Sequence, residues 1–214
     1  ETNGQSLVDG LENLVRDIEN NHGALAVTLS DPDAFQVGDN IATSKGAVVY
    51  QNRMFQLIQY SPTTDQVHKT PLVIFPPWIN KFYILDLKPQ NSLIKWAVEQ
   101  GYTLFVVSWV NPDATYADVG IDTYIEEGFL TAINEVKAIT GEKKVNVIGY
   151  CIAGTMLSAT LAYMARTGDK SVKSATFFTA LADFTDAGET EVFLEKDFLA
   201  GIDAEVAAKG YLHS

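Results

Sequence analysis

Residues 145–154 carry the clearest structural signal in the chain: Val145-Asn146-Val147-Ile148-Gly149-Tyr150-Cys151-Ile152-Ala153-Gly154. An apolar run typical of a buried strand ends at Gly149, and a helical pattern begins after Cys151. A strand that turns sharply into a helix around Gly-x-Cys presents a nucleophile at the edge of a sheet. The residues two before and two after the nucleophile must be small, and Gly149 and Ala153 are. The motif predicts that Cys151 is a catalytic nucleophile, although a lone cysteine is more often a small buried hydrophobe.

Strand and helix patterns alternate on both sides of this motif. Apolar runs at 71–75, 104–108, 145–148 and 175–179 predict strands, and helical patterns at 91–100, 122–139 and 153–166 separate them. Two earlier segments, 47–50 and 55–60, are spaced for an antiparallel hairpin. This alternation predicts an α/β fold: a mostly parallel sheet with helices on both faces and an antiparallel hairpin at its start.

The pattern also predicts where the chain divides. Residues 1–34 contain an amphipathic helix at 6–20 that lies outside the alternation, so we expect the end of an N-terminal region there. Residues 35–188 are expected to form the first part of a catalytic domain. Residues 189–214 are acidic and rich in alanine without a further strand pattern, and we expect them to begin a lid or cap insertion.

Composition excludes several kinds of function. A net charge of −12 argues against nucleic acid as a partner, because phosphate backbones need clustered Lys and Arg. No apolar run is long enough to span a bilayer. The single cysteine cannot form an intrachain disulfide, which fits a reducing cytoplasm. With one cysteine and three dispersed histidines, no metal site is expected.

The loop after the 71–75 strand is the second candidate site. In this architecture the loop and the residue after the nucleophile each supply one backbone N–H to an oxyanion hole, so we predict Ile79 and Ile152 for these roles. Ligands of such sheets bind at the carboxyl ends of the strands. The predicted substrate contacts are Trp78, Asn80, Tyr83, Trp109 and Tyr150. The alternative is that the aromatic residues only pack in the core, and that the Asn111-Pro112-Asp113 segment is a plain turn.

Several segments together resemble one known family. They are Val37-Gly38-Asp39-Asn40-Ile41-Ala42, Pro76-Pro77-Trp78-Ile79-Asn80-Lys81-Phe82-Tyr83-Ile84-Leu85-Asp86-Leu87, Val107-Ser108-Trp109-Val110-Asn111-Pro112-Asp113, Asn146 to Thr155, and Leu181-Ala182-Asp183-Phe184. These segments are similar to those of polyhydroxyalkanoate synthases, the long single-subunit type, from about Phe35 onward. One departure is Ala153, because the family usually has a glycine there.

The resemblance implies a function and its setting. It implies an α/β-hydrolase fold and a polymerising acyltransferase, which makes polyhydroxyalkanoate from (R)-3-hydroxyacyl-CoA and releases CoA through a cysteine thioester. It implies hydroxyacyl-CoA and the growing polyester chain as partners, a homodimer of the full-length protein, no cofactor, and a cytoplasmic location at polyhydroxyalkanoate granules.

The resemblance also implies a Cys-Asp-His triad whose acid and base follow the nucleophile. Only His213 follows Cys151, without late strands in between, so we expect this chain to be an internal fragment that lacks the triad Asp and His and is inactive alone. Two alternatives stay open. One is a cysteine hydrolase or intracellular depolymerase of the same fold, against which the 76–87 segment speaks. The other is a non-catalytic granule-associated module.

Overall fold

The structure, a computed structural model, describes residues 2–23, 26–27, 29, 31, 33–186 and 188–212. The chain forms two compact units, Glu1–Ile41 and Ala42–Ser214. In the first unit, helix α1 (Gln5–Asn20) confirms the predicted amphipathic helix, and its apolar side chains, among them Leu7 and Leu11, are exposed. The predicted domain limits after residues 34 and 188 stay predictions.

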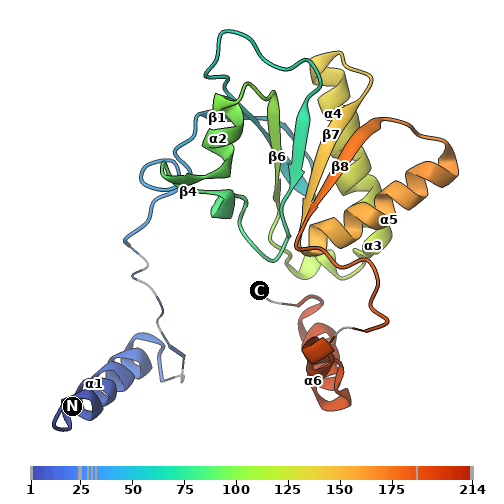
Figure 1. Cartoon of the computed structure of the whole chain (residues 1–214). Helices are drawn as coiled ribbons and strands as arrows, with labels where there is room; N and C mark the ends of the chain where they lie inside the picture. The colour runs from blue at the N-terminus through green and yellow to red at the C-terminus, as the bar shows by residue number, and fades with distance from the viewer. Residues whose placement is uncertain are drawn as a thin grey trace. The chain divides into compact units, whose positions relative to one another are not determined.

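The second unit is built on a sheet of six strands (Figure 1). The strands are β1 (Gly46–Gln51), β2 (Phe55–Tyr60), β3 (Leu72–Phe75), β6 (Leu104–Trp109), β7 (Val145–Tyr150) and β8 (Val172–Phe178). They lie in the order β1-β2-β6-β3-β7-β8. The pairs β1–β2 and β2–β6 are antiparallel, whereas β3–β6, β3–β7 and β7–β8 are parallel. The predicted mixed sheet with a hairpin at its start is confirmed.

Strand β3 is the first parallel strand in the chain and lies at the centre of the sheet. The chain continues to β6 on one side and then crosses to β7 on the other. Such a reversal leaves the loops that follow the two inner strands side by side at the carboxyl edge, where this architecture binds ligands. The pairing of Phe75 with Gly149 places the loop after β3 next to the turn after β7.

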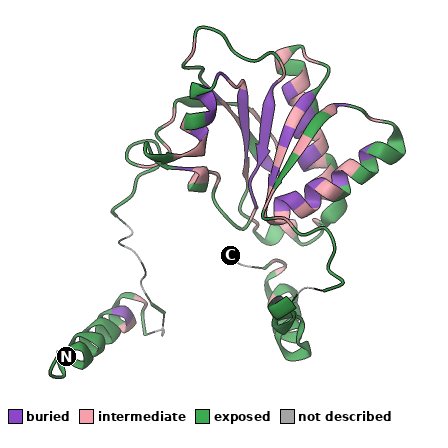
Figure 2. Cartoon of the chain, viewed as in Figure 1, coloured by how far each residue is buried: buried purple, intermediate pink, exposed green. Residues whose placement is uncertain are grey.

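Helices cover both faces of the sheet. Helix α2 (Leu93–Glu99) lies on one face, and α4 (Thr131–Thr140) and α5 (Ile152–Thr167) lie on the other. Alternate residues of β3 face opposite sides of the sheet. Val73 and Phe75 pack with α4 and α5, whereas Leu72 and Ile74 pack with α2. Because both faces are covered, all four residues of β3 are buried (Figure 2).

The helix predicted at 122–139 is present but changes its winding. It begins as α3 (Ile121–Thr123), continues as the π-helical segment η3 (Tyr124–Leu130), and ends as α4. Hydrogen bonding from i to i+5 in η3 brings residues five apart to the same side, and the rings of Tyr124 and Phe129 both contact Trp109. The π segment therefore shapes the aromatic packing below the carboxyl edge.

The helix predicted at 91–100 is shorter than expected, because its first residues form a small hairpin. Residues 82–92 form the 3₁₀ turn η1 (Phe82–Leu85) and the strands β4 (Asp86–Lys88) and β5 (Asn91–Ser92). The buried Asp86 carboxylate accepts hydrogen bonds from the hydroxyls of Ser44 and Ser92. The Ser92 hydroxyl also caps α2 by accepting from the Lys95 N–H at 2.8 Å.

The remaining elements follow β6 and β8. They are the 3₁₀ turn η2 (Ala114–Tyr116), the 3₁₀ segment η4 (Gly188–Leu194) and helix α6 (Lys196–Lys209). As predicted, no strand follows residue 189 within the described residues, which end at Leu212. None of the helices in the described part of the chain is long and apolar enough to cross a membrane.

Candidate active site

Cys151 forms the whole of the turn between β7 and α5. Its backbone has φ 54° and ψ −128°, a conformation that costs a non-glycine residue roughly 1–3 kcal/mol. The Cys151 carbonyl accepts hydrogen bonds from the N–H groups of Gly154 and Thr155 at 2.8 and 3.2 Å, which starts the helix at once. Cys151 is half-buried and unbonded to any other cysteine. The predicted strand–turn–helix arrangement is therefore present, with the thiol at the carboxyl edge of the sheet.

Two glycines allow the strand and the helix to meet this closely. A Cβ on Gly149 would lie 2.7 Å from the Gly154 Cα, and a Cβ on Gly154 would lie 2.4 Å from the Ala180 Cβ. Both distances are shorter than carbon atoms tolerate. Ala153 is small and fully buried, as the motif requires. The tightest approach, however, is at Gly154, one residue later than the motif indicated, which explains why an alanine is accommodated at position 153.

The end of β8 and the residues that follow it hold the turn at Cys151 in place by hydrogen bonds. The Cys151 N–H donates to the Phe178 carbonyl at 2.9 Å, and the Thr155 hydroxyl donates to the Leu181 carbonyl at 2.6 Å. These bonds and the contact of Ala180 with Gly154 hold the strained residue from both flanks. Sequence reasoning did not single out Thr155 or Ala180 for this role, because their partners are more than twenty residues away.

The two amides predicted for the oxyanion hole have no acceptor among the described residues. Ile152 is the first residue of α5, and its N–H has no partner within the helix. Ile79 follows Trp78 in the loop after β3, and its N–H is likewise unbonded, whereas the next amide, that of Asn80, donates to the Pro77 carbonyl. Both N–H groups are thus available to a ligand.

Trp78 and Trp109, two of the predicted substrate contacts, lie together in an aromatic cluster. Their ring centroids are 6.2 Å apart at 87°, and Tyr124 contacts both, at 4.6 and 5.5 Å. The Trp109 indole N–H donates to the Pro76 carbonyl at 2.7 Å. Trp109 therefore also anchors the start of the loop that carries Ile79. Tyr124 belongs to the same cluster, although the sequence indicated only a helix position for it.

A second bond joins the loops after β3 and β6. The Lys81 ammonium donates to the Asn111 side-chain carbonyl at 2.8 Å. Asn111 of the Asn-Pro-Asp segment thus contacts the far end of the loop that carries Ile79 through a hydrogen bond between exposed side chains. Asn80 lies between these two anchors and is exposed.

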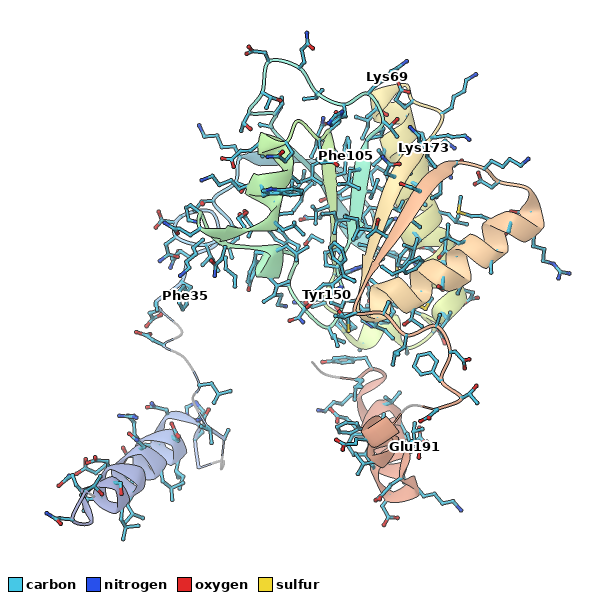
Figure 3. All side chains as sticks on the ribbon, viewed as in Figure 1. Phe35, Lys69, Phe105, Tyr150, Lys173 and Glu191 are labelled. Atoms are coloured by element: carbon cyan, nitrogen blue, oxygen red, sulfur yellow. The ribbon has the colours of Figure 1, made fainter. Side chains whose placement is uncertain are left out.

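Tyr83 and Tyr150, the other predicted substrate contacts, are half-buried and lie on different elements. Tyr83 is in η1 and packs its ring on Phe82, with centroids 5.4 Å apart. Tyr150 is the last residue of β7, directly before Cys151, at the carboxyl edge of the sheet (Figure 3). No described contact joins Tyr83 to the Trp78 cluster.

A cavity of about 360 Å³ opens beside the loop after β3. Trp78, Ile79, Tyr116 and Tyr124 form one wall, and the end of α6 with Tyr211 and Leu212 forms another. Burial raises the pKa of Tyr116 to about 12 and also raises the pKa of Tyr124, so both phenols are neutral near pH 7. The cavity is lined mostly by apolar and neutral groups, and Cys151 is not among its lining residues.

Within the described part of the unit Ala42–Ser214, no acid and histidine complete a triad with Cys151. His68 lies before β3, at the end of the sheet away from Cys151, and His213 lies outside the described residues. The Asp183 carboxylate accepts from the Thr185 N–H and hydroxyl, which lowers its pKa. Within the described residues no three His, Cys, Asp or Glu side chains are grouped to hold a metal ion.

Comparison with family models gives two matches. The description "Poly-beta-hydroxybutyrate polymerase (PhaC) N-terminus" applies to residues 1–97, and "alpha/beta hydrolase fold" applies to residues 64–213. The second match includes the strand–turn–helix around Cys151 and the loop after β3.

Curated relatives match almost the whole chain. A poly(3-hydroxyalkanoate) polymerase of Methylorubrum extorquens is 48% identical over 212 residues, which is 99% of this chain and 35% of the relative. The poly(3-hydroxyalkanoate) polymerase subunit PhaC of Rhizobium meliloti (strain 1021) is 47% identical over 211 residues, which is 99% of this chain and 34% of the relative. The chain thus spans about a third of the length of these relatives.

Among solved structures, the fold is similar to that of a fungal esterase from Rhizomucor miehei. The TM-score is 0.50 at 15% sequence identity, and the match covers 81% of this chain and 53% of the esterase. At this identity the likeness concerns the fold alone.

Proposed function

The chain belongs to the α/β hydrolase fold family and, within it, to the poly(3-hydroxyalkanoate) polymerases, and from this membership we propose a function for the whole protein. It is a polymerising acyltransferase that builds polyhydroxyalkanoate from (R)-3-hydroxyacyl-CoA and releases CoA. This chain supplies the nucleophile Cys151 and the oxyanion-hole amides of Ile152 and Ile79. The triad acid and base come from a part of the protein outside this chain.

In the first half-reaction, the Cys151 sulfur attacks the carbonyl carbon of the hydroxyacyl-CoA thioester, and the thiol proton passes to the base. The tetrahedral intermediate carries its negative charge on the former carbonyl oxygen. The Ile152 and Ile79 N–H groups donate to that oxygen, and one such donor is worth roughly 3–4 kcal/mol. The C–S bond to CoA then breaks, and the CoA thiolate takes up the proton.

In the second half-reaction, the hydroxyl of another hydroxyacyl unit attacks the Cys151 thioester. An oxygen ester forms, the base accepts the hydroxyl proton, and the Cys151 sulfur leaves. Trp78, Trp109, Asn80, Tyr83 and Tyr150 flank the path of the acyl chain. We further propose that the full-length protein is a homodimer that acts in the cytoplasm at the surface of polyhydroxyalkanoate granules and needs no cofactor.

One observation supports the nucleophile above all others. Cys151 is held at φ 54° between β7 and α5 by contacts on both flanks, at a cost in free energy that packing alone would not require. A cysteine that served only as a buried hydrophobe would occupy an ordinary strand or helix position. A strained, half-buried thiol that is followed directly by the unbonded Ile152 amide fits covalent catalysis.

The decisive experiment traps the covalent intermediate in the whole protein. After incubation with 3-hydroxybutyryl-CoA, intact-mass spectrometry should show one added hydroxybutyryl group, and peptide mapping should place it on Cys151. The matched control is Cys151→Ser, which keeps the shape of the side chain and should carry no thioester. Acylation at another residue, or equal CoA release by Cys151→Ala, would refute the assignment.

The product distinguishes polymerase from hydrolase. A polymerase gives chloroform-soluble polyester together with CoA, because a hydroxyl attacks the thioester. A hydrolase or depolymerase gives free 3-hydroxybutyrate, because water attacks. Analysis of the products from one reaction mixture therefore decides between the two.

The isolated 214-residue chain is expected to show no turnover. General-base assistance is typically worth about 10²–10⁴-fold in rate, and His68, the histidine in the described part of the unit Ala42–Ser214, lies before β3 at the other end of the sheet from Cys151. CoA release measured with a thiol reagent tests this expectation. Turnover by the chain that disappears in Cys151→Ala would show that it contains its own base.

A further inference from the structure

The amino ends of three parallel strands meet at the edge of the sheet opposite Cys151. The Asn146 N–H donates to the Pro71 carbonyl at 2.8 Å, and the Val145 N–H donates to the Ser171 carbonyl at 2.9 Å. These bonds bring the segments before β3, β7 and β8 side by side. Lys69 and Lys173 lie at this edge, whereas Tyr150 lies at the other (Figure 3).

Two adjoining cavities open at this edge. The larger, of about 420 Å³, is lined by Lys69, Thr70, Lys143, Lys144 and Lys173, together with Gly141 and Glu142. The smaller, of about 250 Å³, shares Lys69, Thr70 and Lys173 with it and adds His68, Tyr102 and Asn146. The two cavities are neighbours that share Lys69, Thr70 and Lys173, and we call them together the lysine cleft.

The charge of the lysine cleft is opposite to that of the chain. Four ammonium groups line it against one carboxylate, and that carboxylate, Glu142, pairs with Lys69 at 3.4 Å. Lys143, Lys144 and Lys173 form no ion pair with any carboxylate of the described residues. The chain as a whole carries −12. These exposed ammonium groups, three of them without a carboxylate partner among the described residues, form a local positive field that attracts anions.

The lining of the lysine cleft points to one class of anion. Its larger part offers four ammonium groups and a hydroxyl beside the single Glu142 carboxylate, and it has no aromatic side chain to hold an organic ring. Lysine ammonium groups act as point charges towards phosphate oxygens. The smaller part adds the His68 and Tyr102 rings, whose centroids are 5.2 Å apart, and the Asn146 amide. The ammonium groups of the larger part can contact a chain of phosphates, and the His68 and Tyr102 rings of the smaller part can contact a planar ring attached to that chain.

We propose that the lysine cleft binds a ligand with a diphosphate or triphosphate group, either inorganic or part of a nucleotide. The site is separate from the thiol. Strand β7 has six residues, so Lys144 and Cys151 lie at opposite ends of about 20 Å of extended chain. A ligand in the lysine cleft therefore does not contact the Cys151 sulfur, and the proposal does not depend on the polymerase activity.

Calorimetric titration of the chain tests the proposal, in a phosphate-free buffer at about 0.05 M salt, where screening is weak. The ligands are pyrophosphate, tripolyphosphate, ADP and ATP. The double variant Lys143→Gln/Lys144→Gln should bind at least about tenfold more weakly, since each lost charged contact is worth roughly a factor of ten. The control is Lys88→Gln, an exposed lysine of β4 outside the cleft, which should bind as the original chain does.

The four ligands also identify the source of the phosphates. Equal affinity for tripolyphosphate and ATP supports an inorganic ligand. Tighter binding of ATP that falls to the tripolyphosphate level in His68→Ala supports a nucleotide. Circular dichroism of each variant checks that it is folded. The proposal is overturned if none of the four ligands binds, or if the double variant and Lys88→Gln bind them equally.

Discussion

The carboxyl and amino ends of the strands β3 and β7 are built in opposite ways. At the carboxyl ends, Cys151 is strained, half-buried and held by contacts from β8 and α5. At the amino ends, Lys143 and Lys144 before β7 and Lys173 near the start of the neighbouring β8 are exposed and form no ion pair within the described residues. One end positions the Cys151 sulfur by packing, whereas the other presents exposed charge. Substitutions should therefore disturb the fold strongly at the first end and weakly at the second.

The largest effect on the free energy of unfolding is expected for the buried aromatic side chains that pack at the carboxyl end of β3. Phe129 is fully buried and stacks on Phe75 with ring centroids 4.3 Å apart. Phe129→Ala should lower the free energy of unfolding by about 3–5 kcal/mol, since it leaves a cavity in the core. Urea unfolding followed by circular dichroism measures this. Phe184→Ala removes a ring that is 57% exposed and should change the value by less than about 0.5 kcal/mol. Similar losses in both variants would contradict the comparison.

The next effect concerns the close approach at Gly154. Gly154→Ala adds a Cβ that meets Ala180 and should cost about 1–3 kcal/mol through overpacking. Its control is Gly201→Ala, in the interior of α6, where no atom lies within 4 Å of the new Cβ. That substitution should stabilise the chain by about 0.5–1 kcal/mol, because alanine favours the helix. If Gly154→Ala and Gly201→Ala shift the denaturant midpoint in the same direction, Gly154 is not constrained by its contact with Ala180.

Backbone strain at Cys151 predicts a smaller effect, in which glycine at this position makes the protein more stable than alanine does. Cys151→Gly relieves the positive φ but gains freedom in the unfolded chain, which offsets part of the benefit. Cys151→Gly should therefore be about 1 kcal/mol more stable than Cys151→Ala, which keeps a Cβ in the strained conformation. Thermal unfolding of the two variants side by side measures the difference. If the alanine variant proves the more stable, the turn is not strained.

The smallest effect is expected at the amino ends. Lys143→Gln/Lys144→Gln removes mutual repulsion and should raise the melting temperature by no more than about 2 °C at low salt. The gain should disappear near 1 M salt, where the screening length is about 3 Å. Lys88→Gln serves as the control and should leave the melting temperature unchanged. A loss of several degrees in the double variant would mean that these lysines support the fold.

Local patterns were sufficient to predict most elements. Residues 55–60 alternate apolar and polar side chains, and they form β2 with the predicted bounds. The turn at Cys151 was predicted because a strand, a small residue and a helix follow one another without a gap. The 86–92 hairpin was missed, because its strands have three and two residues, too few for a period to be visible.

Most supporting residues of the candidate site could not be predicted in this way. Trp109 was predicted as a substrate contact, but its bond to the Pro76 carbonyl joins residues 33 positions apart. The same holds for Lys81 and Asn111, which are 30 positions apart. Side-chain patterns report which face of an element is buried, not which distant element covers it.

The amino-acid sequence by itself determined the order of strands and helices, the family, and the place of Cys151 in a tight turn, because each depends on neighbouring residues. Only the tertiary structure decided that β3 lies between β6 and β7, that Gly154 rather than Ala153 limits the approach of α5, and that the lysines before β3 and β7 gather with Lys173 of β8 at one edge. These facts depend on contacts between segments far apart in the chain, and apolar periodicity shows which face of an element is buried but not which distant segment packs against it.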